Sequence, residues 1–90
     1  MAKEYRVNFD DYSFITEEGT VTGTLDFKMY GKNHNMLIYV TLENGEKIIA
    51  AAYKDKSFFG LEEIDLDTTL ELTFKKTSSG LVRLSELNIV

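Results

Sequence analysis

The stretch that most constrains the fold is Met36 to Tyr53, in which two apolar runs are joined by Asn44-Gly45. Asn-Gly between runs of this kind is the strongest short-range signal for a β-hairpin with a two-residue turn. A two-residue turn pairs Glu43 with Glu46 and so sets the register of both strands. The core-facing pairs are then expected to be Leu42 with Lys47, Val40 with Ile49, Ile38 with Ala51, and Met36 with Tyr53.

The opposite face of this hairpin is also largely apolar. It is expected to carry Leu37, Tyr39 and Thr41 on one strand and Ile48, Ala50 and Ala52 on the other. An antiparallel sheet with one solvated face normally shows polar residues on that face. We therefore expect something to cover part of it.

The composition is that of one small globular domain. The 90 residues are 43% hydrophobic and 12% aromatic, which argues against disorder, and they include no cysteine. The lack of cysteine excludes a disulfide framework and a thiolate metal site; it fits a reducing compartment, and it fits a secreted domain without cysteine equally well. No apolar run approaches the length of a membrane span, so we expect a soluble, cytoplasmic protein that does not bind membranes.

The charge balance disfavours tight nonspecific binding to a polyphosphate. Ten basic and fifteen acidic residues give a net charge of −5. The charges are unevenly spread, because residues 28–56 carry most of the lysines whereas residues 62–71 are acidic without any base. We expect one acidic side and one more basic side.

Alternation of apolar and polar residues predicts strands along most of the chain. An N-terminal ribbon is expected over residues 5–16, and a long strand over Thr20–Tyr30 with Gly23 at an inward position where the strand bends. The inward face of the long strand would carry Val21, Leu25, Phe27 and Met29. Two more strands are expected, around Leu70–Phe74 and over Leu81–Val90, the last with a bulge near Ser85-Glu86 where its apolar phase slips.

From Thr20 onward, the order of elements resembles the oligonucleotide/oligosaccharide-binding (OB) fold. That order is a long strand with an internal glycine, a polar loop, a tight hairpin, a short irregular or helical connection over residues 57–64, and two final strands. The resemblance implies an all-β, five-stranded Greek-key barrel. The whole chain, residues 1–90, would be a single domain, with residues 1–19 as an N-terminal strand extension and residues 20–90 as the barrel. An SH3-like barrel or a β-sandwich would fit the same strand count.

The sequence shows no pattern typical of an enzyme. His34 is the only histidine and lies in a polar loop, without the nucleophile and orienting carboxylate that hydrolytic catalysis requires. Asp65 and Asp67 lack the longer run of ligands around a glycine that a calcium loop needs, and no zinc spacing, phosphate-binding loop or nucleophile elbow is present. We expect neither catalysis nor a metal or other cofactor.

The resemblance implies that the ligand face is flanked by the loop between the first two barrel strands and the loop between the last two. The implied ligand-binding residues are Lys28, Tyr30, Lys32, His34, Tyr39, Lys75 and Lys76. Tyr39 would stand above small Ala50 with its ring open to a stacked base, as in proteins that bind single strands. One ring and a few lysines predict weak binding to single-stranded DNA or RNA. The alternative interpretation is that Tyr39 packs under the N-terminal ribbon and that Lys75-Lys76 only solubilise a hairpin end.

A protein-interaction module or a homo-oligomer is the competing hypothesis. It rests on the apolar outer face of the central hairpin and on Phe58-Phe59, which stand in a connection where polar residues are expected. Self-association through an edge strand would cover such a face. A third hypothesis, mimicry of nucleic acid by the acidic stretch of residues 62–71, rests on charge alone.

Overall fold

The chain forms an all-β fold, which confirms the all-β part of the prediction from the sequence. The computed structural model describes residues 9–30, 36–52, 61 and 63–90. Its elements are a 3-10 turn, η1 (Phe9–Asp11), and six strands: β1 (Ser13–Phe14), β2 (Gly19–Tyr30), β3 (Met36–Leu42), β4 (Lys47–Ala52), β5 (Thr69–Lys76) and β6 (Val82–Ile89). The predictions for residues 5–8 and for most of the connection over residues 57–64 lie outside the described residues.

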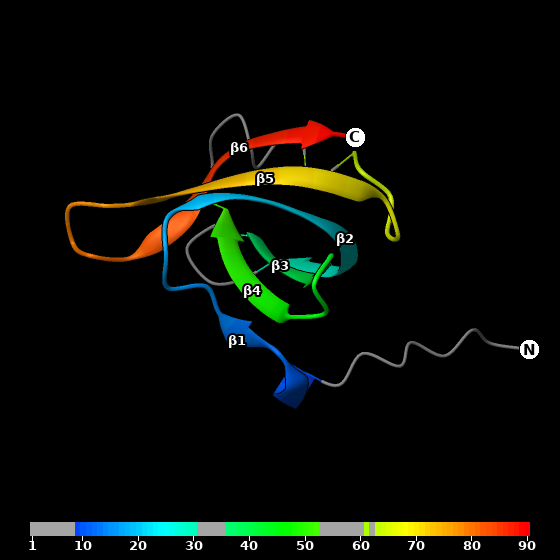
Figure 1. The fold of residues 1–90 in the computed structure, drawn as a ribbon, viewed down its shortest axis with the longest axis horizontal. Coiled ribbons are helices and arrows are strands. Elements are labelled where there is room, and N and C mark those ends of the chain that lie inside the picture. The colour runs from blue at the N-terminus through cyan, green and yellow to red at the C-terminus, as the bar shows by residue number, and fades with distance from the viewer. Residues whose placement is uncertain (1–8, 31–35, 53–60, 62) are drawn as a thin grey trace, which may run out of the picture.

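All six strands belong to one mixed sheet with the order β1-β4-β3-β2-β5-β6. β1 runs parallel to β4, and the other neighbouring strands are antiparallel. β2 joins two halves of the sheet, because Gly19–Thr24 pair with β5 whereas the part from Gly23 to Tyr30 pairs with β3. Figure 1 shows β2 curving between the two halves, so that β5 and β6 lie across from β3 and β4.

The sheet folds back on itself but does not close into the expected five-stranded barrel. β4 and β6 approach each other, yet over their described residues no ladder of hydrogen bonds joins them. The edge of β4 that faces away from β3 is instead taken by β1, which pairs with Ile48 and Ile49. The Ile15 N–H donates to the Ile49 carbonyl at 3.0 Å and extends this contact. β1 thus occupies backbone groups that a closing strand would need.

Two bulges set which side chains face the core. On β2, Leu25 pairs with Val40 and Phe27 with Tyr39, so Asp26 is an extra residue. The bulge sends Leu25 into the core but Phe27 to the opposite face, and the predicted shared face for these two residues is therefore wrong. On β6, Ser85 is the extra residue between Leu84 and Glu86, which confirms the bulge predicted there.

Gly23 lies where β2 passes from one partner strand to the other, and it is buried as predicted. A Cβ atom at this position would stand 2.6 Å from Val40 Cγ1 and 2.8 Å from the Thr41 carbonyl oxygen. Both distances are far below van der Waals contact, so only glycine lets β2 approach β3 this closely.

The central hairpin forms as predicted, but its register differs by one residue. The Leu42 N–H donates to the Glu46 carbonyl, which closes a three-residue loop in which Gly45 has a φ of +94°. A type I turn followed by a left-handed glycine is the usual form of three-residue hairpin loops. Strand pairing then runs from Thr41 with Lys47 to Met36 with Ala52, and Tyr39 pairs with Ile49 instead of standing above Ala50.

The shifted register decides which face of β4 is buried in the main core. Ile48, Ala50 and Ala52 enter the core, whereas the prediction placed Ile49 and Ala51 there. The β3 prediction was correct, since Met36, Ile38, Val40 and Leu42 all belong to the core. The other core residues come from the remaining strands and the segment before β5: Leu25, Leu61, Ile64, Leu70, Leu72, Phe74 and Leu84.

Candidate functional site

The outer face of the β3–β4 hairpin is covered by the segment that precedes β2. Tyr39 is only 8% exposed. Its ring centroid lies 4.9 Å from that of Phe9 and 5.2 Å from that of Tyr12, the latter in an edge-to-face arrangement. Phe27 and Ile49 complete this second, smaller apolar cluster. Tyr39 is therefore packed beneath the N-terminal segment, as the alternative interpretation of the sequence expected, and its ring is not open to a stacked base.

A hydrogen bond to Asp26 holds the covering segment, which carries Phe9 and Tyr12, against the sheet. The Tyr12 hydroxyl donates to Asp26 Oδ2 at 2.7 Å, and the Thr41 hydroxyl donates to the same oxygen. The bulge at Asp26 makes this possible, because it turns the carboxylate to the outer face. Burial, together with the hydrogen bond and charge of Asp26, raises the pKa of Tyr12 from 10.0 to about 12. The covering segment is thus held by a partly buried hydrogen bond as well as by contacts between aromatic rings.

Lys28 has a structural role. Its ammonium donates to the Leu61 carbonyl at 2.8 Å and to the Ile64 carbonyl. It thereby satisfies backbone acceptors in the turn before β5, where Ile64 N–H also donates to Leu61 O. The Asp26 bulge brings Lys28 to this position.

The remaining predicted site residues fall into two regions. Tyr30 is 62% exposed at the end of β2, beside the loop that carries Lys32 and His34, which lie outside the described residues. Lys75 and Lys76 are exposed at the end of β5. Of the five predicted ligand-binding residues that the structure describes, Lys75 and Lys76 are the two that it brings together.

A third cation, Arg83, joins these two lysines. Lys75 pairs directly with Arg83 across the β5–β6 hairpin, and Lys76 pairs with Val82. These cations line one depression together with three hydroxyl-bearing side chains. We call this surface the basic hairpin tip. It consists of Lys75, Lys76, Arg83, Thr77, Ser78 and Ser85. Figure 1 shows the hairpin projecting at one end of the molecule. Arg83 was missed from the sequence, because it becomes the neighbour of Lys75 only through the register of the β5–β6 hairpin.

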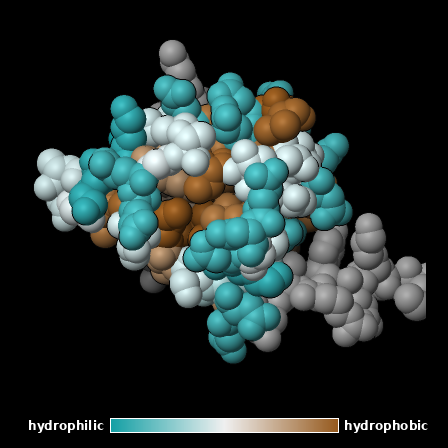
Figure 2. All heavy atoms as spheres, in the orientation of Figure 1, coloured by the Kyte–Doolittle hydropathy of each residue, from teal (hydrophilic) through white to brown (hydrophobic). Residues whose placement is uncertain are grey.

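A second depression lies between β1 and the start of β2. We call it the acidic hollow, and it is lined by Ser13–Gly19, Val21, Leu42, Glu46–Ile48 and Phe74. Its volume is about 450 Å³. Figure 2 shows a hollow on the face in view with apolar side chains at its bottom and hydrophilic ones around it. Sequence reasoning did not single out this site, because residues from β1, β2, β4 and β5 meet there only once the sheet folds back.

The described residues place no cluster of three or more His, Cys, Asp or Glu side chains where it would hold a metal ion. In the same part of the chain, no helix has the length and apolar character that crossing a membrane requires.

Comparison with known proteins adds no relative to this description. No protein family, curated protein or solved structure matches the chain.

Proposed function

We propose that this chain is a small non-catalytic binding module of the OB type that binds single-stranded nucleic acid weakly through its basic hairpin tip. The support for the fold is the strand order β4-β3-β2-β5-β6. In the OB arrangement, the long, bent first strand of the barrel pairs with both the second and the fourth. Here these three strands are β2, β3 and β5, and β1 is an addition to this arrangement. Fold analogy alone is a weak warrant for function, so the proposal depends on the site.

The arrangement of cations at the hairpin tip is the observation that carries the proposal. Lys75 and Arg83 are directly opposed on neighbouring strands, with Lys76 next to them. A phosphate placed between the Lys75 and Arg83 side chains would accept charge-assisted hydrogen bonds from both, and further hydrogen bonds from the neighbouring hydroxyls. Glu18 lies close by, and its carboxylate accepts a hydrogen bond from the Lys76 backbone N–H at 2.7 Å.

Other features of the molecule keep the proposed affinity low. The chain has a net charge of −5, and the Tyr39 ring is covered. Tyr30, the exposed aromatic ring among the described ligand-binding residues, stands at the end of β2 away from the tip, so the tip lacks a stacked base, which would contribute about 1 to 3 kcal/mol. Three phosphate contacts alone predict a dissociation constant of micromolar or weaker at physiological salt.

The proposal is tested by fluorescence anisotropy with labelled twelve-nucleotide dT and rU strands at low and rising salt. Three contacts to a single strand predict a slope of about −2 in log affinity against log salt. The variant Lys75→Gln/Lys76→Gln/Arg83→Gln is expected to lose most of this affinity and slope. Lys47→Gln serves as the matched control, because its ammonium lies over the Tyr12 ring, 5.3 Å from the centroid. The absence of binding at tens of micromolar, or equal binding by the triple variant, would contradict the proposal.

Self-association is a second candidate, and the exposed apolar residues of β6 favour it. β6 stands at one edge of the sheet, and Ile89 on it is 65% exposed. An edge strand with exposed apolar residues is a template for pairing with another chain. The apolar outer face of β3–β4 no longer supports this candidate, because the chain covers it with Phe9 and Tyr12. Sedimentation velocity across a hundredfold range of concentration is expected to show a dimer that Ile89→Lys abolishes; a monomer throughout would contradict it.

A further inference from the structure

The acidic hollow has the size and lining of a site for a small molecule. Its volume of about 450 Å³ lies within the usual range of ligand pockets. Val21, Leu42, Ile48 and Phe74 supply apolar lining. Leu42, Ile48 and Phe74 belong to the main core and are at most 9% exposed, whereas Val21 and Ile15 pack against it and are half-buried, so these two offer apolar surface to the hollow. A ligand with an apolar body can bury surface there.

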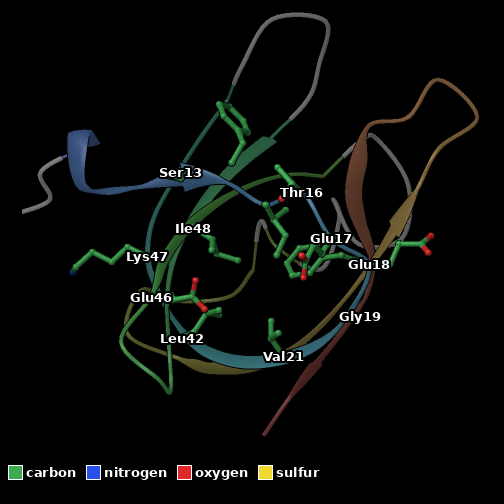
Figure 3. A pocket seen from close by; sticks show the side chains of 13 residues that line it. Ser13, Thr16, Glu17, Glu18, Gly19, Val21, Leu42, Glu46, Lys47 and Ile48 are labelled. Carbon is green, nitrogen blue, oxygen red and sulfur yellow. The ribbon is translucent and has the colours of Figure 1, made fainter.

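The charges at the mouth of the hollow are arranged unequally. Figure 3 shows the Glu17 and Glu46 carboxylates turned toward the hollow from opposite sides, whereas Lys47 and Glu18 extend away from it. Contacts elsewhere explain why these two side chains, Lys47 and Glu18, point away from the hollow. The Lys47 ammonium lies over the Tyr12 ring, and Glu18 accepts a hydrogen bond from Lys76 N–H. Because the Lys47 ammonium is turned away, the charged groups that face the hollow are the carboxylates of Glu17 and Glu46.

Glu46 is held in place before any ligand arrives. The Asn44 side-chain amide donates to Glu46 Oε1 at 2.9 Å, and the Asn44 amide oxygen accepts from Glu46 N–H at 2.9 Å. Glu17, in contrast, has no hydrogen-bond or ion-pair partner among the described residues. One positioned carboxylate and one without a partner, facing each other over an apolar floor, form an environment that favours a cation.

We propose that the acidic hollow binds a small organic cation with an apolar body, with its ammonium group between Glu17 and Glu46 and its apolar part on Ile15 and Val21. Organic anions are disfavoured by the same two carboxylates, and so are the phosphates that the basic hairpin tip would bind. The site is therefore separate from the proposed nucleic-acid surface, and neither proposal depends on the other.

The test is a titration of the full chain followed by ¹H–¹⁵N NMR, with n-hexylammonium, n-hexanol and n-hexanoate as probes of matched length. Hexylammonium is expected to shift the amide signals of Glu17, Val21, Glu46 and Ile48. Its affinity is expected to exceed that of hexanol by about tenfold, since a charge-assisted contact is worth one to two powers of ten. Hexanoate is expected to leave these signals unchanged.

Two variants assign the selectivity to the carboxylates. Glu17→Gln/Glu46→Gln is expected to bind hexylammonium no more tightly than hexanol, while still binding both. Glu86→Gln, which removes an exposed carboxylate outside the hollow, is expected to behave as the unaltered chain does. Equal binding of all three probes, signal changes centred elsewhere, or unchanged selectivity in the double variant would overturn the proposal.

Discussion

Gly23 is the residue at which a single added methyl group should do most harm. Its missing Cβ leaves room for the Thr41 carbonyl, which would lie 2.8 Å away and belongs to the backbone of the neighbouring strand. Overpacking of this kind costs about 1 to 3 kcal/mol, so Gly23→Ala is expected to lower the free energy of unfolding by that amount. Urea denaturation measures it, with half-buried Thr22→Ala as the neighbouring control. A Gly23→Ala variant as stable as the parent would show that β2 and β3 separate without cost.

Tyr12 should make stability fall at high pH. Its pKa is raised in the folded chain from 10.0 to about 12, mainly by burial and by Asp26. Because the folded state holds the phenol proton more tightly, this contribution is complete below pH 10 and is lost between pH 10 and 12. The loss is at most about 1.4 kcal/mol for each pH unit. The measurement is the difference in the free energy of unfolding between the parent chain and Tyr12→Phe, because this difference cancels the pH dependence of the rest of the chain.

For Tyr12→Phe, that difference should narrow as the pH rises from 10 to 12. At neutral pH the variant is expected to be less stable by about 1 to 2 kcal/mol, because the hydroxyl that donates to Asp26 is gone. A difference that stays constant over the pH range would contradict the raised pKa.

The roles of single residues were the part least accessible to sequence reasoning. Lys28 and Tyr39 were both predicted to meet a ligand, and both are used within the fold instead. Each role depends on a contact with a residue distant in sequence, Leu61 for Lys28 and Tyr12 for Tyr39. Alternation within one strand carries no information about such contacts, and the Asp26 bulge reverses the alternation itself.

The loop of the central hairpin is the element in which one glycine sets the register. Gly45 has a φ of +94°, and a Cβ there would meet nothing within 4 Å. The cost of Gly45→Ala therefore comes from the backbone conformation alone and is expected to be about 1 kcal/mol. Gly45→Asn is expected to cost less, because asparagine tolerates the left-handed region better. Thermal denaturation of both variants measures this, and an alanine variant equal to the asparagine variant would contradict the loop geometry.

Elements were predicted better than their phases. Asn44-Gly45 correctly identified the hairpin, and the phase slip in the last strand correctly located the bulge at Ser85. The predicted two-residue turn was wrong. Asn44-Gly45 is equally compatible with a three-residue loop over residues 43–45 in which Gly45 is left-handed, and the chain forms that loop. A one-residue change in the loop moved Ile48 and Ala50 into the core, which shows why the two faces of β4 were exchanged.

At the scale of the whole molecule, the N-terminal extension changes how the sheet ends. The all-β class could be predicted from the alternation of apolar and polar residues. The covering of the outer face could be predicted because both faces of the central hairpin are apolar. Closure of the barrel depends on competition for the outer edge of β4, and β1 takes that edge at Ile48 and Ile49. β1 has only two residues, so no local pattern in the sequence reveals that it excludes β6 from this edge.

The extension also determines how much apolar surface the molecule shows, and Tyr12 is the residue on which this depends. Tyr12→Ala removes the ring that packs edge-to-face on Tyr39 and the hydroxyl bound to Asp26. It is expected to lower the free energy of unfolding by on the order of 3 kcal/mol and to increase binding of a hydrophobic fluorescent dye, since Tyr39 and Ile49 become exposed. Phe14→Ala is the matched control from the same segment, because Phe14 is already 60% exposed. If Tyr12→Ala bound no more dye than Phe14→Ala, the segment would not be the cover of this face, and the apolar outer surface would again be available to a partner.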